Sequence, residues 1–183
     1  MTSGIPVSVN GMAAAGQPLA EELASYREIG ASLVGLGVAK LRRHGLAAAV
    51  DEVKASGLAV AYLFMPLLAA PGDDAAWAED ARTLDVALAA ATALGAGTIY
   101  VTSGPSGRLS WEEAAESLAE RLAPTVRRAA DLGVTFAVEN TMPLRADLSF
   151  THSLRDAAAL ARRLDIGLCV DLYCCWQERG LID

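Results

Sequence analysis

The sequence predicts an α/β protein in which helices cover a parallel sheet, and the sheet forms an incomplete (β/α)8-type barrel. Apolar runs of strand length alternate with longer helix-like segments along all 183 residues. The runs are continuously apolar, which is typical of parallel strands buried on both faces. Alternation alone fits either an open doubly wound sheet or a barrel. The distribution of small and bulky side chains along two of the runs favours the barrel.

Six segments have the length and composition of strands. Each is a largely apolar run, and most end at a polar residue, a glycine or a proline, as expected where a buried strand meets a turn. The expected strands span residues 5–10, 32–38, 58–66, 98–104, 134–140 and 166–173.

Five complete helices are expected between these strands, and each carries an amphipathic pattern or a boundary signal. They span 18–30, a segment including 46–57, 73–95, 110–133 and 151–164. Ser110 and Glu113 form an S-x-x-E capping box. Gly95 is expected just after the third helix, and Thr151 is expected as the N-cap of the fifth. The segment 177–183 resembles the start of a further helix.

Side-chain alternation in the last two runs separates small residues from bulky ones. Glu139 shares a strand face with Ala137, and Asp171 shares a face with Gly167 and Cys169. The bulky side chains of both runs point the opposite way. A barrel with a small, polar inner wall near its mouth and large residues under its helices would show this pattern.

Composition limits the classes of function. The 15 basic and 22 acidic residues give a net charge of −7, which disfavours binding to duplex nucleic acid. No apolar run is long enough to span a membrane, and no secretory signal is apparent. Three cysteines, two of them adjacent, do not suggest a disulfide framework, so a cytoplasmic location is expected. We expect a single domain over residues 1–183.

The stretches "FAVEN" and "SFTHSLRDAAALARRLDIGLCVDLYCCWQERG" resemble the xylose-isomerase-like sugar phosphate isomerase/epimerase superfamily. This resemblance implies a TIM barrel with a divalent metal at its C-terminal mouth. Glu139 and Asp171 match the metal ligands after the fifth and sixth strands. Glu139 would also take part in proton transfer. The implied cofactor is Mn²⁺, Mg²⁺, Co²⁺ or Zn²⁺, and with only these two ligands we expect weak binding.

The sequence departs from the family pattern in two ways. Family members usually carry a histidine three residues after the aspartate, where it helps to hold substrate, and here Cys174 takes that place. The seventh and eighth strands, which bring a further histidine and glutamate, are not seen, so we expect an apparent truncation after the sixth strand. Asn10, His152 and Cys174 are candidate substrate-binding residues at the mouth, although each also has an ordinary structural explanation.

The implied activity is metal-assisted proton transfer next to a carbonyl of a small sugar or polyol. The alternative is a non-catalytic truncated barrel that serves as a binding or assembly subunit, or a fragment of a longer enzyme. An open barrel leaves its first and sixth strands as apolar edges, and exposed edges recruit other chains. We therefore also expect a homo-oligomer, most simply a two-fold dimer.

Overall fold

The sheet is parallel and follows the order of the sequence. The computed structural model describes residues 5–181, and within them six strands pair in the order β1-β2-β3-β4-β5-β6. The strands are β1 (Val9–Asn10), β2 (Leu33–Gly37), β3 (Ala59–Met65), β4 (Thr98–Val101), β5 (Thr135–Glu139) and β6 (Gly167–Cys169). This order confirms the barrel-type prediction, because a doubly wound sheet would place its first strand in the middle.

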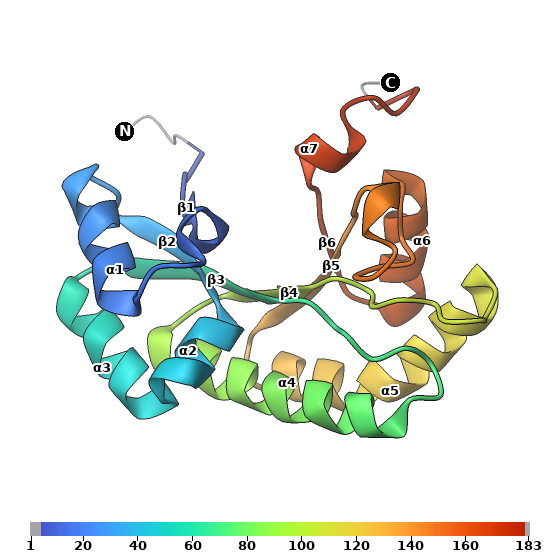
Figure 1. The fold of residues 1–183 in the computed structure, drawn as a ribbon, viewed down its shortest axis with the longest axis horizontal. Helices are drawn as coiled ribbons and strands as arrows, with labels where there is room; N and C mark the ends of the chain where they lie inside the picture. Colours follow the sequence, from blue (N-terminus) through green and yellow to red (C-terminus); the bar gives the residue numbers. More distant parts are fainter. Residues whose placement is uncertain (1–4, 182–183) are drawn as a thin grey trace.

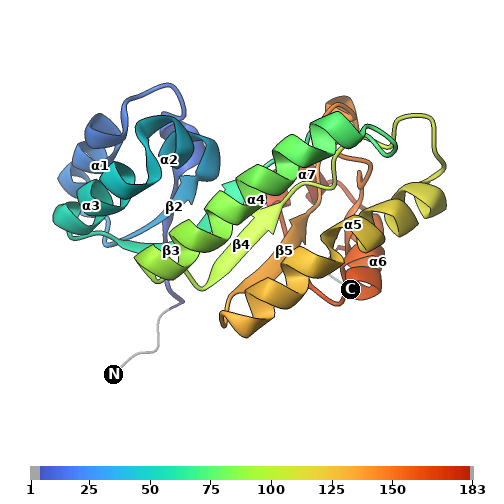
Figure 2. The ribbon, with the colours of Figure 1, turned by 90° about the horizontal axis from the view of Figure 1, so that it is seen from below.

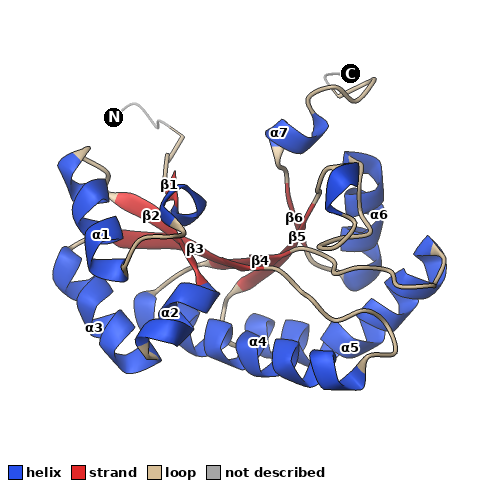
Figure 3. Ribbon diagram, viewed as in Figure 1, coloured by secondary structure: helices blue, strands red, loops and turns tan. Residues whose placement is uncertain are grey.

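The sheet curves without closing. Figure 1 shows it as a trough, with β1 and β2 rising on one side and β5 and β6 on the other. Figure 3 shows the same view with the strands in red and the helices in blue around the convex side. In the described part of the chain β1 pairs only with β2, and β6 only with β5, so the barrel is incomplete as expected.

Helices cover the convex face, and Figure 2 shows α4 and α5 lying across it from below. The α-helices are α1 (Leu19–Glu28), α2 (Val38–His44), α3 (Leu46–Ser56), α4 (Asp74–Leu94), α5 (Trp111–Asp131), α6 (Leu154–Leu164) and α7 (Leu172–Cys175). Two short 3-10 helices are η1 (Gly11–Ala14) and η2 (Pro143–Arg145). The capping box of Ser110 and Glu113 is confirmed, and Gly95 ends α4 in the left-handed conformation.

The core lies between the convex face of the sheet and this helical layer. Leu63, Ile99 and Val138 alternate with inward-facing residues along their strands and are fully buried. Leu88 of α4 and Leu122 of α5 belong to the same cluster. Burial of this apolar layer therefore provides the main drive to fold the strands into one sheet.

The concave face carries aromatic rings in its centre. Tyr62 and Phe64 of β3 lie near Tyr100 of β4, with ring centroids 5.4 Å and 5.7 Å from that of Tyr100. Gly35 and Gly37 of β2 leave the space that the β3 rings fill, since a Cβ on either would meet a ring. The small inner wall expected from β5 and β6 therefore does not extend to β3 and β4.

The two edge strands are shorter than expected. Strand pairing covers only Val9–Asn10 of the expected strand 5–10. At the other edge, β6 stops at Cys169, and the expected strand 166–173 turns into α7. The side chain of Asp171 supports this change, because it caps the N-terminus of α7 through the backbone N–H of Tyr173 at 2.9 Å.

Three helix predictions need correction. A separate helix, α2, starts at Val38, and Gly45 with φ +90° divides it from α3, so seven α-helices are found in residues 5–181 where five complete ones were expected. Ser153, not Thr151, caps α6, and its hydroxyl accepts the backbone N–H of Asp156 at 3.0 Å. No helix forms over residues 177–181, and the rest of that expected helix lies outside the described residues.

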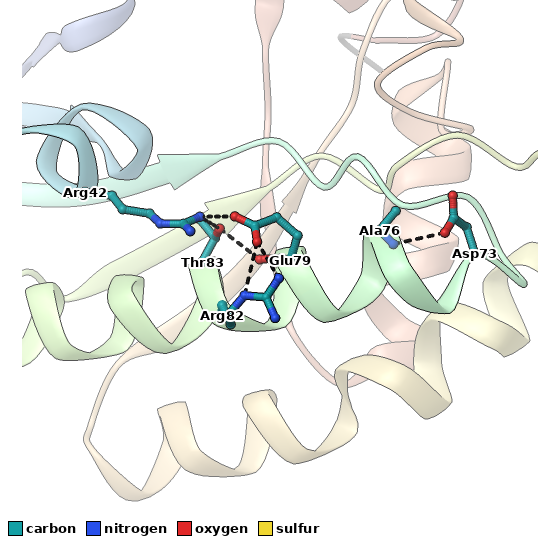
Figure 4. A network of polar contacts seen from close by, with 6 residues as sticks. All are labelled: Arg42, Asp73, Ala76, Glu79, Arg82 and Thr83. Carbon is teal, nitrogen blue, oxygen red and sulfur yellow. Dashed lines mark hydrogen bonds and ion pairs between the residues drawn. The ribbon is translucent and has the colours of Figure 1, made fainter.

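Polar contacts on the surface tie α2 to α4. Figure 4 shows Arg42 of α2 reaching Glu79 and Thr83 of α4, with Arg42 Nη1 2.9 Å from Thr83 Oγ1. Arg82 pairs with the same Glu79 at 2.6 Å, and Asp73 caps α4. These side chains are exposed, so the contacts orient the helices more than they stabilise the fold. Within residues 5–181 no helix is long and apolar enough to cross a membrane.

Candidate active site

Glu139 is the last residue of β5 and lies at the C-terminal edge of the sheet. Its ladder partner is Cys169 of β6, whose thiol lies 3.8 Å from Glu139 Oε1. The Glu139 carbonyl accepts the hydroxyl of Thr151 at 3.3 Å, which ties the strand end to the loop before α6. The carboxyl group is therefore held on the concave side next to the sixth strand.

Burial raises the pKa of Glu139 from 4.5 to about 7. The negative charge of Asp171 acts in the same direction, and the hydrogen bond from Cys169 opposes both. A carboxyl group with a pKa near neutrality is about half protonated at pH 7. It can therefore both take and give a proton, which suits general acid–base catalysis.

Asp171 is fixed through both its side chain and its backbone. Its Oδ1 accepts the Tyr173 N–H at 2.9 Å, and its Oδ2 accepts the Cys174 thiol at 3.0 Å. Its backbone N–H donates to Asn140 Oδ1 at 2.8 Å, and its carbonyl accepts from Asn140 Nδ2 at 3.1 Å. The carboxylate thus caps α7 and stands beside the site at the same time.

The thiols next to the two carboxyl groups are proton donors. Burial raises the pKa of Cys169 and of Cys174 to about 12. The charge of Glu139 adds to the effect at Cys169, and the hydrogen bond to Asp171 adds to it at Cys174. Both thiols are therefore protonated at neutral pH and are poor nucleophiles. Cys174 contacts Asp171, and the structure places it at the cavity wall.

Two cavities open on the concave side and share part of their walls. Their volumes are about 570 and 500 Å³, within the usual range for small-molecule sites. Five residues line both cavities: Asn10, Tyr100, Glu139, Asp171 and Tyr173. We treat them as two parts of one cleft, hereafter the mouth cleft.

The predicted substrate residues are only partly brought together. Asn10 lines the mouth cleft, and its Nδ2 lies 3.5 Å from the Tyr100 hydroxyl. Its Oδ1 also accepts the Met12 N–H at 2.9 Å, so it makes the turn contact expected of a strand-end asparagine. Cys174 lines one part of the cleft. His152 lines neither part, and the structure does not bring it to Glu139 or Asp171.

Several site residues were missed from the sequence. Tyr62 and Tyr100 line the mouth cleft, and burial raises the pKa of both phenols, so they remain hydrogen-bond donors at neutral pH. Side-chain alternation in their strands could have placed them on the concave face. Asn140 directly follows Glu139 in the sequence, but its contacts with Asp171 depend on where β6 lies and had no sequence signal.

The donor set fits a hard divalent ion in part. Glu139 and Asp171 supply two carboxylates to one cleft, and Mg²⁺ is commonly held by one or two carboxylates while it keeps several water ligands. Among residues 5–181 no group of three or more His, Cys, Asp or Glu side chains is arranged to hold an ion. The described residues therefore offer two ligands of an incomplete set.

Comparison with known proteins gives the family. The family model of the xylose isomerase-like TIM barrel matches residues 23–182. The chain belongs to this family, in agreement with the resemblance seen in the sequence. No protein with a curated description matches the chain.

Solved structures share the fold. A protein of Sinorhizobium meliloti 1021, SMc04130, is 24% identical, with a TM-score of 0.78 over 96% of this chain and 66% of its own. An AP endonuclease of family 2 from Brucella melitensis is 23% identical, with a TM-score of 0.71 over 89% and 66%. The 3-keto-D-glucoside 4-epimerase YcjR from E. coli is 15% identical, with a TM-score of 0.76 over 97% and 72%.

Two further neighbours hold a metal. A xylose isomerase-like TIM barrel protein from Mycobacterium smegmatis is in complex with magnesium, and the IOLI protein binds a zinc atom. Each is 14% identical to this chain, with a TM-score of 0.69 over 91% of it and 64% or 62% of the neighbour, respectively. At these identities the likeness concerns the fold. The chain spans 66% of the length of the first two relatives.

Proposed function

We propose that this chain carries the proton-transfer residues of a metal-dependent isomerase or epimerase site for a small sugar or polyol. One observation supports this most directly. A carboxyl group with a pKa of about 7, Glu139, shares the mouth cleft with a second carboxylate, Asp171. A polar strand end at an ordinary surface would not have that burial.

The reaction follows from the chemistry of these groups. Glu139 takes a proton from the carbon next to the substrate carbonyl, and the electron pair of that C–H bond moves toward the carbonyl oxygen. Delivery of a proton to the opposite face of the same carbon gives an epimer, and that proton must come from a second acid or from solvent, because Glu139 serves one face only. Return to the neighbouring carbon gives an isomer, with the hydroxyl proton passing between the two oxygens.

Glu139 and Asp171 would hold the ion, and the proposed choices are Mn²⁺, Mg²⁺, Co²⁺ or Zn²⁺. When bound, it supplies a Lewis acid that stabilises negative charge on the substrate oxygens. Asp171 has both oxygens engaged by Tyr173 and Cys174, so it is oriented before any ion arrives. Two protein ligands support only weak binding.

The cleft walls fit a small polyhydroxy compound. The hydroxyls of Tyr62 and Tyr100 and the amide of Asn10 can donate hydrogen bonds to substrate oxygens. The rings of Tyr62 and Tyr100 offer flat faces to its C–H groups. Cys174 lines the same cleft, and its sulfur can weakly accept a hydrogen bond from a substrate hydroxyl while its own proton is donated to Asp171.

Two measurements test the proposal. Calorimetric titration of Mn²⁺ should show weak binding to the wild type and none to Glu139→Ala. Incubation of a panel of ketohexoses and polyol ketones in D₂O with Mn²⁺ should show deuterium at the carbon next to the carbonyl by NMR. Glu139→Gln should abolish that exchange. Equal Mn²⁺ affinity in both proteins, or none in either, would remove the metal centre from this chain.

A non-catalytic role as a binding or assembly subunit is the second candidate. It is favoured by the missing third metal donor in the described residues and by the two unpaired sheet edges in the same range. Deuterium exchange separates the candidates, because a non-catalytic chain produces none even when Mn²⁺ binds.

A further inference from the structure

We infer that Asn140 is a positioning residue that fixes Asp171 beside Glu139 at the mouth cleft. Its link to metal binding rests on the proposed function, whereas its contact with Asp171 can be tested without any metal. Asn140 does not line the cleft, so it acts through Asp171 and not on a substrate.

The contact between the two residues is reciprocal. The Asp171 N–H donates to Asn140 Oδ1 at 2.8 Å, and Asn140 Nδ2 donates to the Asp171 carbonyl at 3.1 Å. Asn140 is 1% exposed, so these bonds are shielded from water. A carboxamide carries the same donor and acceptor as a peptide group, and here it binds a peptide group as a neighbouring strand would.

The position of this contact in the sheet explains its value. The last backbone pair between β5 and β6 is Glu139 with Cys169, and beyond it the chain turns toward α7. Asn140 adds one side-chain-to-backbone pair past the end of that ladder and reaches the residue two positions on. The location of Asp171 relative to β5 is therefore set by a side chain.

Support beyond the end of β6 matters because β6 is short and paired on one side only. It has three residues, all of them half-buried, and in the described structure it is an edge strand. Val170, next to Asp171, is 44% exposed, so apolar burial contributes little there. Without Asn140 the backbone at Asp171 would lose two hydrogen bonds and its fixed distance from Glu139.

Amide hydrogen exchange, followed by NMR in metal-free buffer, tests the contact itself. In Asn140→Ala the Asp171 amide should exchange at least tenfold faster than in the wild type, because its acceptor is gone. In Asn140→Asp the amide should stay protected, since an oxygen acceptor remains in the same place. Asn140→Leu keeps the branched shape without polar atoms and replaces the alanine variant if that variant does not fold.

Asp80→Ala is the matched control. The Asp80 carboxylate is 4% exposed and accepts the backbone N–H groups of Leu68 and Ala69 at 2.9 and 2.8 Å, after β3 and outside both parts of the cleft. Like Asn140→Ala, this variant loses hydrogen bonds between a buried side chain and the backbone. The Ala69 amide should therefore exchange faster, whereas the Asp171 amide should not. The inference would be overturned if the Asp171 amide exchanged at the wild-type rate in Asn140→Ala. It would also be overturned if that amide exchanged equally faster in Asp80→Ala.

Mn²⁺ calorimetry then tests whether the contact matters for the site. Asn140→Ala should bind Mn²⁺ at least tenfold more weakly than the wild type, and Asp80→Ala should bind it with wild-type affinity despite its lower stability. The positioning role would be refuted if Asn140→Ala bound Mn²⁺ with wild-type affinity although its Asp171 amide had lost protection from exchange. If the wild type binds no Mn²⁺, the metal centre of the proposed function is lost, and the exchange data alone decide whether Asn140 holds Asp171.

Discussion

The ring of Tyr62 occupies the space where any residue other than glycine at position 35 would place its Cβ. An added Cβ would lie 1.9–2.6 Å from two ring carbons and the hydroxyl oxygen of Tyr62. The lack of a side chain at Gly35 of β2 therefore leaves the space in which Tyr62 of β3 lines the mouth cleft. This relationship links a backbone position in one strand to the wall of the site in the next.

Gly35→Ala should destabilise the fold and shift Tyr62. Overpacking of this kind costs about 1–3 kcal/mol of unfolding free energy, measured by urea denaturation. Gly97→Ala is the control, because a Cβ there meets nothing within 4 Å. In Tyr62→Ala the same Gly35→Ala change should cost little, and an equal cost in both backgrounds would contradict the steric explanation.

Glu139→Gln should stabilise the metal-free protein at high pH. The folded-state pKa of about 7 lies above the ordinary 4.5, so the folded protein binds more protons than the unfolded one between these values. Stability therefore falls as pH rises from 4.5 to about 7 and then stays lower. The folded-state pKa lies about 2.5 above the ordinary value, which corresponds to at most about 3.4 kcal/mol of unfolding free energy. Urea denaturation with a chelator should show this gain at pH 8 and none at pH 4.

Glu113→Gln provides a control of opposite sign. The carboxylate of Glu113 accepts hydrogen bonds from Ser110 in the capping box, which lowers its pKa. Its charged form therefore favours folding, and the substitution should lower stability at pH 8. If Glu139→Gln behaved in the same way, the burial argument for Glu139 would be wrong.

Lys40→Met should strongly destabilise the protein by leaving the charge of Glu22 without its partner. Glu22 is 1% exposed, pairs with Lys40, and accepts the Tyr26 hydroxyl at 3.0 Å. Removing one partner of a buried pair costs about 3–5 kcal/mol, whereas replacing both partners by uncharged residues costs much less. The double variant Lys40→Met with Glu22→Gln should recover most of the loss in thermal and urea unfolding. Lys40 Nζ also donates to the Ala14 carbonyl at 2.6 Å, and failure to recover would show that Lys40 acts through this contact.

The sequence predicted the fold better than the site, for physical reasons. Strand order and the outer core follow from continuous apolar runs and side-chain alternation, which are local properties. The ends of β1 and β6 were wrong because edge strands are held on one side only, and because Asp171 caps a short helix at Leu172 where a strand was expected. Glu139 and Asp171 were found as strand-end acids, but the aromatic wall and Asn140 depend on contacts between strands.

The described chain should self-associate through its sheet edges, and this is the last prediction. Large apolar side chains are exposed at both edges: Ile5, Val7 and Met12 near β1, and Val170, Leu172, Tyr173 and Trp176 near β6. Within residues 5–181 β1 and β6 each pair on one side only, and unpaired outer edges favour association. Light scattering after size exclusion at micromolar concentration, with reductant, should give a mass near twice 19.0 kDa.

Val7→Glu combined with Trp176→Glu should shift the protein toward monomer, because charges at an edge oppose pairing. Ile29→Glu, a change of the same kind at a 70% exposed residue after α1, should leave the mass unchanged. A stable, monodisperse monomer of the wild type would show that these apolar edges tolerate water without a partner.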